Sequence, residues 1–144
     1  MCDVSRPFSV RMDEETHEQL LARAKAVDLT ASQLVNRYVR EGLRMDEHPG
    51  ISFVNTSNGR RAVLASRPRI QVIDLIATWQ GQRQDVSETA RYFEVSDDDV
   101  KAAVRYYAAF KTELDETIRQ NRAAQANFEQ ILARRRTRAR RASA

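Results

Sequence analysis

Residues 7–12 read PFSVRM, and this short stretch decides how the first part of the chain can fold. Every second side chain in it is apolar, which is the period of a β-strand with one buried face. The apolar positions are Phe8, Val10 and Met12, and the polar positions between them are Ser9 and Arg11. A single short strand cannot bury its apolar face alone. The stretch therefore predicts a strand that pairs with its copy in a second chain, with an edge strand of an intramolecular sheet as the alternative.

Two amphipathic helical patterns follow this strand. The first is expected over residues 14–27, with Asp13 as its N-cap. Thr30 and Gln33 form a capping box for the second, which is expected to end at Gly42 and the MDEHPG stretch. The apolar stripe of the second helix comprises Leu34, Val35, Tyr38, Val39 and Leu43. One strand and two helices in about 45 residues cannot build a large core, so this region also favours pairing with a second copy.

The order PFSVRM, DEETHEQLLARAKAVD, LTASQLVNRYVREGL resembles the ribbon-helix-helix proteins of the Arc/MetJ class. This resemblance implies an intertwined dimer over residues 1–45, in which two strands form an antiparallel ribbon. The dimer core would comprise Phe8, Val10, Met12, Leu34, Val35 and Tyr38. Members of the class usually carry Gly before the second helix, where Asp28 stands here, and Asp tolerates a left-handed backbone better than most residues.

The same resemblance implies that the outer face of the ribbon enters the major groove of operator DNA. The implied DNA-binding residues are Pro7, Ser9 and Arg11 on the strand and Thr30, Ala31 and Ser32 at the start of the second helix. Arg11 can donate two hydrogen bonds to guanine, and the free N–H groups at a helix N-terminus suit a phosphate. With one arginine per chain on the reading face, we expect affinity to depend mainly on phosphate contacts and on the Arg-rich C-terminal tail.

Residues 48–116 resemble a second family. The segments GRRAVLA and VKAAVRYYAAF are similar to the actinobacterial form of the DUF433 family of small bacterial domains. The resemblance implies a helical domain over residues 46–111 with a β-hairpin and a helix-turn-helix-like core. Members are commonly VapB-type antitoxins, the partners of PIN-like ribonuclease toxins, and often carry a DNA-binding segment. Ser66 stands where members usually have Gly, and Lys111 stands near a common Pro.

The residues themselves support a hairpin at Asn58-Gly59 and helix-turn-helix spacing over residues 85–107. Ala90 is expected at the helix crossing, Val95 in the turn and Val100 on the next helix. That helix has Ser96 as its cap and three aspartates in its first turn, which repel DNA phosphates. We therefore expect packing or protein contact from it, and not base reading.

Four arginines lie on and after the hairpin: Arg60, Arg61, Arg67 and Arg69. Two interpretations remain open for them, a solvated hairpin or contacts to phosphate or to carboxylates of a toxin. The basic excess of the chain lies elsewhere. Residues 1–45 have no net charge, residues 46–122 have a net charge of −1, and residues 123–144 have a net charge of +5.

The final region, residues 112–144, predicts a helix toward Arg134 and an Arg-rich tail that is disordered when free. Three roles stay open: toxin binding, completion of the second domain with a solvated tail, or non-specific contact with DNA phosphates. The candidate toxin-binding residues are Leu114, Ile118, Phe128, Ile131, Leu132, Arg134, Arg135 and Arg136. Their apolar stripe is interrupted by polar residues, which is typical of a segment that orders in a groove on another protein.

Little in the sequence favours an enzyme. His17 and His48 are the only histidines, no metal-ligand spacing occurs, and no phosphate-binding loop or nucleophile motif is present. No cofactor or catalytic residue is predicted, and Cys2 has no cysteine with which to pair. No stretch is long and apolar enough for a bilayer, so we expect a cytoplasmic protein without membrane contact. The sequence thus predicts a mainly α dimeric antitoxin, or alternatively a stand-alone ribbon-helix-helix repressor without a toxin partner.

Overall fold

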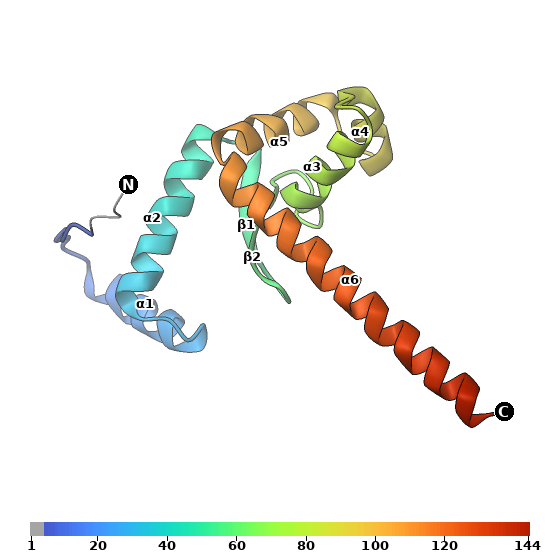
Figure 1. Ribbon diagram of the computed structural model, residues 1–144. Helices are drawn as coiled ribbons and strands as arrows, with labels where there is room; N and C mark the ends of the chain where they lie inside the picture. The colour runs from blue at the N-terminus through green and yellow to red at the C-terminus, as the bar shows by residue number, and fades with distance from the viewer. Residues whose placement is uncertain (1–4) are drawn as a thin grey trace. The chain divides into compact units, whose positions relative to one another are not determined.

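The computed structural model describes residues 5–144, so Cys2 lies outside the described residues. These residues form six helices and one two-stranded hairpin, which confirms the mainly α fold class (Figure 1). The chain divides into two units, residues 1–43 and 44–144, and the boundary falls inside the second helix. No helix in the described range is long and apolar enough to cross a membrane.

The helices of the first unit start as the sequence predicts. Helix α1 spans Glu14–Ala26, and the carboxylate of Asp13 accepts a hydrogen bond of 2.8 Å from the Thr16 N–H. Helix α2 spans Ala31–Glu47 and begins with the predicted capping box. The Thr30 N–H donates to Gln33 Oε1 at 2.9 Å, and the Gln33 N–H donates to Thr30 Oγ1 at 3.1 Å.

Helix α2 continues through Gly42 and ends at Glu47, so the predicted stop at the MDEHPG stretch is confirmed and the stop at Gly42 is wrong. A glycine inside a helix costs only about 1 kcal/mol, and Gly42 is flanked by good helix formers. The helix ends next to His48, the residue before Pro49, where the proline ring disfavours helical backbone. The expected linker over residues 46–50 is thereby reduced to a short turn.

The second unit opens with the predicted hairpin. Strand β1, Ile51–Thr56, pairs antiparallel with strand β2, Gly59–Leu64, in a register that joins Thr56 to Gly59. Gly59 has a φ of 102°, a conformation that glycine adopts without strain. At the start of the hairpin the backbone of Gly50 lies against α5, so close that an added Cβ would stand 2.8 Å from Ala102 Cβ.

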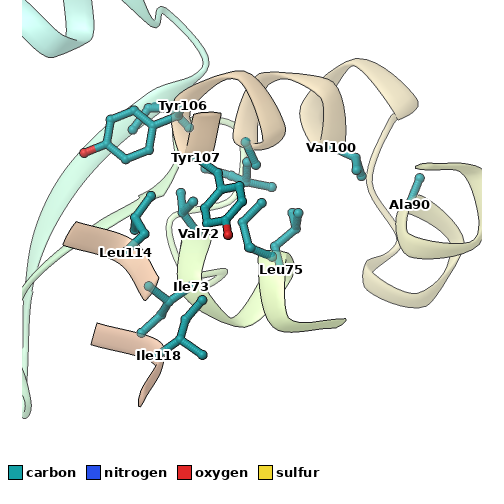
Figure 2. Packing of buried hydrophobic residues seen from close by; sticks show 13 residues of the cluster. Val72, Ile73, Leu75, Ala90, Val100, Tyr106, Tyr107, Leu114 and Ile118 are labelled. Carbon is teal, nitrogen blue, oxygen red and sulfur yellow. The ribbon is translucent and has the colours of Figure 1, made fainter. Parts of the chain in front are cut away.

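Three short helices pack behind this hairpin: α3 over Val72–Gly81, α4 over Val86–Phe93 and α5 over Asp97–Ala109. The apolar cluster that joins them comprises Ile51, Leu64, Val72, Ile73, Leu75, Ile76, Ala90, Val100, Ala103, Tyr106, Tyr107, Leu114 and Ile118 (Figure 2). Ala90 and Val100 are 3% and 0% exposed, and Val95 packs against the cluster. The predicted helix-turn-helix crossing is therefore confirmed.

The last helix, α6, differs most from the expectation. It spans Lys111–Ala142, so the predicted disordered tail is helical to within two residues of the end. Arginine and alanine are both strong helix formers, and Thr137 bonds back to the carbonyl of Ala133 at 3.0 Å. The first turns of α6 belong to the core of the second unit, whereas the remainder runs past its other elements (Figure 1).

Candidate functional site

The predicted reading strand is unpaired in the single chain. Residues 5–13 form no helix or strand, and the sheet of the described residues contains β1 and β2 alone. Phe8 is 90% exposed, Val10 64% and Met12 37%. The structure therefore gives no support to an intramolecular edge strand. The apolar side chains of this segment are thus left partly or largely uncovered in the single chain.

The helices of the first unit carry a second uncovered apolar surface. Only Ala24 and Leu34 are buried among the apolar residues described in this unit, while Tyr38 and Val39 are exposed. A groove of about 410 Å³ lies along α1 and α2, with Met12 at its edge. It is lined by Met12, Thr16, Gln19, Leu20, Arg23, Val35, Tyr38 and Val39. Of the predicted dimer-core residues, Leu34 is thus the one already buried in the monomer.

The predicted DNA-binding residues lie at the surface of this unit. Pro7, Ser9 and Arg11 are exposed on the segment before α1, and Thr30 and Ser32 are exposed at the start of α2. Asp28 has a φ of 56°, so this residue adopts the left-handed turn for which ribbon-helix-helix proteins usually carry glycine. The capping box uses the N–H groups of Thr30 and Gln33. The N–H groups of Ala31 and Ser32, between these two residues, have no backbone acceptor in the described chain and remain available to an anion.

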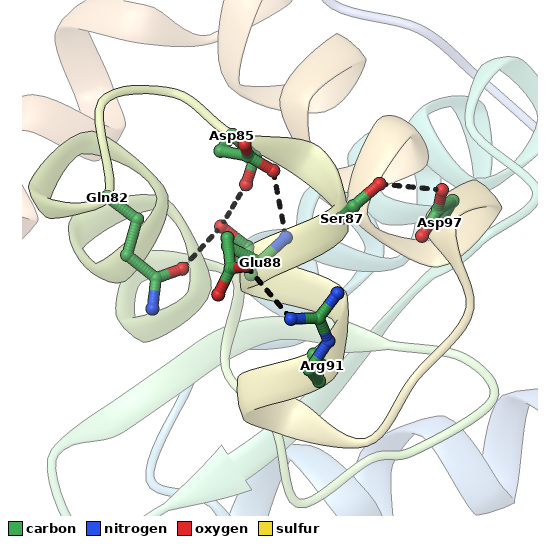
Figure 3. Close-up of polar contacts among 7 residues, drawn as sticks. Gln82, Asp85, Ser87, Glu88, Arg91 and Asp97 are labelled. Atoms are coloured by element: carbon green, nitrogen blue, oxygen red, sulfur yellow. Dashed lines mark hydrogen bonds and ion pairs between the residues drawn. The ribbon is translucent and has the colours of Figure 1, made fainter.

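The acids of the helix-turn-helix serve mainly as caps (Figure 3). Asp85 accepts a 2.9 Å bond from the Glu88 N–H at the start of α4, and Ser96 and Asp99 form a reciprocal capping box at the start of α5. Asp97 accepts a 3.2 Å hydrogen bond from Ser87, which ties the two helices together. These contacts account for the first-turn acids as helix-stabilising groups, in line with the predicted packing role.

Two tyrosines on α5 are core residues. Tyr106 is 2% and Tyr107 is 7% exposed, so neither offers a free ring for stacking with a base. The Tyr107 hydroxyl donates to Asp115 at 2.6 Å, and Lys111 bonds the same carboxylate at 2.6 Å. Lys111 and the Tyr107 hydroxyl together hold the pKa of Asp115 below its usual value.

Arg44, the first residue of the second unit, joins the end of α2 to α5 and α6 within that unit, a contact that the sequence does not reveal. Its guanidinium donates to both carboxylate oxygens of Glu113, at 3.1 and 2.8 Å, and to the Tyr106 hydroxyl at 3.0 Å. It also lies 3.9 Å from the centre of the Phe110 ring. Burial lowers the pKa of Arg44, but the hydrogen bonds to Glu113 and Tyr106 outweigh it and leave the pKa raised. The partners are more than 60 residues away in sequence, so no local signal marks them.

The arginines of the hairpin are only partly free. Arg60 donates a hydrogen bond of 3.2 Å to the Asn55 side chain across the hairpin. Burial raises the pKa of Asp74, and the positive charge of Arg61 offsets part of this shift. The Nε of Arg61 is buried without a hydrogen bond. Arg67 and Arg69 are exposed in the turn that follows β2.

Along α6 the candidate toxin-binding residues fall into a buried group and an accessible group. Leu114 and Ile118 are 6% and 7% exposed and belong to the core, which corrects their assignment to a partner surface. Their position follows from the hairpin and α3, whose apolar residues need cover on that side. The residues that stay accessible beyond the core include Phe128 at 60% and Ile131 at 41% exposure. Leu132 is half-buried, and Arg134, Arg135 and Arg136 are exposed.

The described residues contain no group of three or more His, Cys, Asp or Glu side chains arranged to hold a metal ion. His48 packs with its ring centre 5.3 Å from that of Tyr106 and 5.9 Å from that of Phe110. Comparison with family models, curated proteins and solved structures finds no significant match to this chain. The features that bear on the class of protein are therefore the uncovered apolar side of the first unit and the exposed part of α6.

Proposed function

We propose that this chain is a dimeric DNA-binding antitoxin. The first unit would pair with its copy and bind operator DNA, and the second unit would present α6 to a PIN-like ribonuclease toxin. The single observation that carries the proposal is the uncovered apolar side of the first unit. Phe8, Val10 and Met12 are exposed on a segment without secondary structure, and Met12 also lines a groove of about 410 Å³ along α1 and α2.

A second copy of the same unit fits this surface in length and chemistry. Pairing of two PFSVRM segments would satisfy the backbone groups of both and place their apolar side chains over the helices. The left-handed Asp28 and the capping box at Thr30 supply the tight connection between α1 and α2 that a ribbon-helix-helix unit needs. Ser9 and Arg11 would then face outward on the ribbon, toward the major groove.

The toxin-binding part of the proposal concerns the second unit and α6. It depends on the resemblance of residues 48–116 to the DUF433 family and on the exposed Phe128 and Ile131 of α6. Because Leu114 and Ile118 complete the core of the second unit, the stand-alone repressor remains a second candidate. In that alternative the second unit would sense a signal or oligomerise.

Two experiments test the proposal. Co-expression with the product of an adjacent PIN-like reading frame should yield a complex and relieve its toxicity. If the neighbouring product is harmless alone, or if no complex forms, the stand-alone repressor is favoured.

Operator recognition is tested by Arg11→Ala, which should weaken binding by about 1–3 kcal/mol and relax sequence preference. Arg6→Ala removes a neighbouring exposed arginine and is the matched control. Equal operator binding by the Arg11→Ala variant and the parent would remove Arg11 from the reading face.

A further inference from the structure

The last ten residues of α6, residues 133–142, have an unusual composition. They contain six arginines, three alanines and one threonine, with no acid and no large apolar side chain. The six arginines are all exposed, and the segment is helical throughout. We refer to it as the arginine segment. Its length as a helix is about 15 Å, so six positive charges stand close together on one short rod.

These charges have no compensation within the described chain. Elsewhere on the surface arginines pair with acids, as Arg91 does with Glu88 at 2.9 Å and Arg119 does with Glu116. No ion pair or side-chain hydrogen bond involves any guanidinium of the arginine segment. Like charges on adjacent turns of a helix repel one another, so binding of a polyanion would remove an unfavourable term.

The arrangement of the arginines around the helix indicates the shape of that polyanion. At about 100° per residue, Arg134, Arg138 and Arg141 fall on one stripe about 60° wide. Arg136 and Arg140 form a second stripe, about 150° away around the helix, and Arg135 lies outside both stripes, about 90° from the first and about 120° from the second. A flat or concave protein surface contacts one side of a helix and would engage one of the two stripes. A groove with anionic walls on both sides would engage both.

The remaining side chains point in the same direction. A protein interface depends on buried aromatic or aliphatic anchors, and the arginine segment has none, because its other residues are Ala and Thr. Small side chains also permit close approach of the helix to the floor of a groove. The major groove of B-form DNA is about 12 Å wide, which matches a helix about 10–12 Å across. The major groove of duplex RNA is deep and narrow and does not admit a helix.

We propose that the arginine segment binds duplex DNA, with the end of α6 in the major groove and its two arginine stripes on the phosphates of opposite walls. The contact is independent of base sequence, since the segment presents no side chain suited to reading a base except the arginines that hold phosphates. This inference goes beyond the proposed function and does not require operator recognition by the first unit. It also assigns Arg134 and Arg136 to DNA and leaves Phe128, Ile131 and Leu132 as the surface for a protein partner.

The test measures binding of the full chain to a labelled 30-base-pair duplex of random sequence by fluorescence anisotropy, over a range of salt concentrations. One variant carries Arg134→Gln, Arg138→Gln and Arg141→Gln, and a second carries Arg136→Gln and Arg140→Gln. The control variant loses three exposed cations of α4 and α5: Arg91→Gln, Lys101→Gln and Arg105→Gln. Circular dichroism verifies that helix content is kept in every variant.

Each phosphate contact contributes about 0.9 to the slope of log K against log salt. We expect the slope per chain to fall by about 2.7 in the triple variant and by about 1.8 in the double variant, with little change in the control. The proposal is overturned if neither variant changes the slope more than the control does, or if one stripe alone accounts for the effect. It is also overturned if duplex RNA binds as tightly as duplex DNA, or if polyglutamate of equal charge competes as well as unlabelled DNA does. Retained slopes together with operator binding lost in Arg11→Ala would reject this inference and leave the proposed function standing.

Discussion

Removal of the Arg44 side chain should destabilise the second unit more than any other single change of a partly exposed cation. In the folded chain its guanidinium makes two hydrogen bonds to Glu113, one to the Tyr106 hydroxyl, and a cation–π contact with Phe110. The Arg44 side chain is 16% exposed and that of Glu113 is 58% exposed. The ion pair itself is therefore largely solvated and contributes less than about 1 kcal/mol.

Most of the stabilisation comes from the buried end of this contact. A hydrogen bond from a charged donor to the Tyr106 hydroxyl contributes about 1.5 kcal/mol, and the stacking on Phe110 about 1 kcal/mol. Together with the weak ion pair, the loss in Arg44→Ala is about 2–3 kcal/mol. In a unit of this size such a loss lowers Tm by about 10 °C.

Thermal unfolding followed by circular dichroism measures this loss, with Arg105→Ala as the matched control because Arg105 is exposed on α5. Tyr106→Phe removes the hydroxyl alone and should cost about 1 kcal/mol, whereas Glu113→Ala should cost less than Arg44→Ala. The reasoning is refuted if Arg44→Ala unfolds at the same temperature as Arg105→Ala. It is also refuted if Glu113→Ala has the full effect of Arg44→Ala, since the ion pair would then dominate.

Three further predictions concern other parts of the chain. Gly50→Ala should lower the free energy of unfolding by about 1–3 kcal/mol, because the added Cβ has no room against α5. Gly42→Ala should raise it by about 1 kcal/mol, because alanine favours the helix and nothing lies within 4 Å of the added Cβ. Chemical denaturation measures both, and equal effects of the two variants would contradict the packing. Phe8→Asp should raise the dissociation constant of the dimer about 100-fold, because about 3 kcal/mol of apolar burial is lost per dimer. Sedimentation equilibrium measures this constant, and Ser5→Asp is the control. The lowered pKa of Asp115 means that its stabilising effect is present above the unfolded value of about 3.9 and is lost as pH falls through the folded value. Asp115→Asn should therefore lower Tm at pH 7 and reduce the further fall in Tm between pH 5 and pH 2, and an unchanged acid profile would count against this account.

Local signals in the sequence were sufficient for most helix starts and for the hairpin. Asp13, Thr30 and Ser96 each accept a bond from the N–H three residues later, which depends only on neighbouring residues. The helix-turn-helix crossing at Ala90 and Val100 follows from apolar spacing in the same way. Helix α2 ends within the predicted MDEHPG stretch and not at Gly42, because a glycine is a weak stop signal and the neighbouring helix formers outweigh it.

The C-terminal residues are helical where the sequence predicts disorder, because their helix propensity outweighs the repulsion between their charges. Residues 133–142 are arginine, alanine and threonine, and the first two are strong helix formers whatever their net charge. Their extension from a helix that is already anchored in the core avoids the cost of nucleating a new one.

The sequence by itself determined the mainly α class, the positions of the caps and hairpin, and the unsatisfied apolar face of PFSVRM, because each depends on residues close together in the chain. Tertiary structure alone decided that Leu114 and Ile118 complete the core of the second unit and that Arg44 lies over Phe110 and between Tyr106 and Glu113. These contacts join segments separated by up to 69 residues, and chain folding, not spacing, sets which side chains meet at such separations.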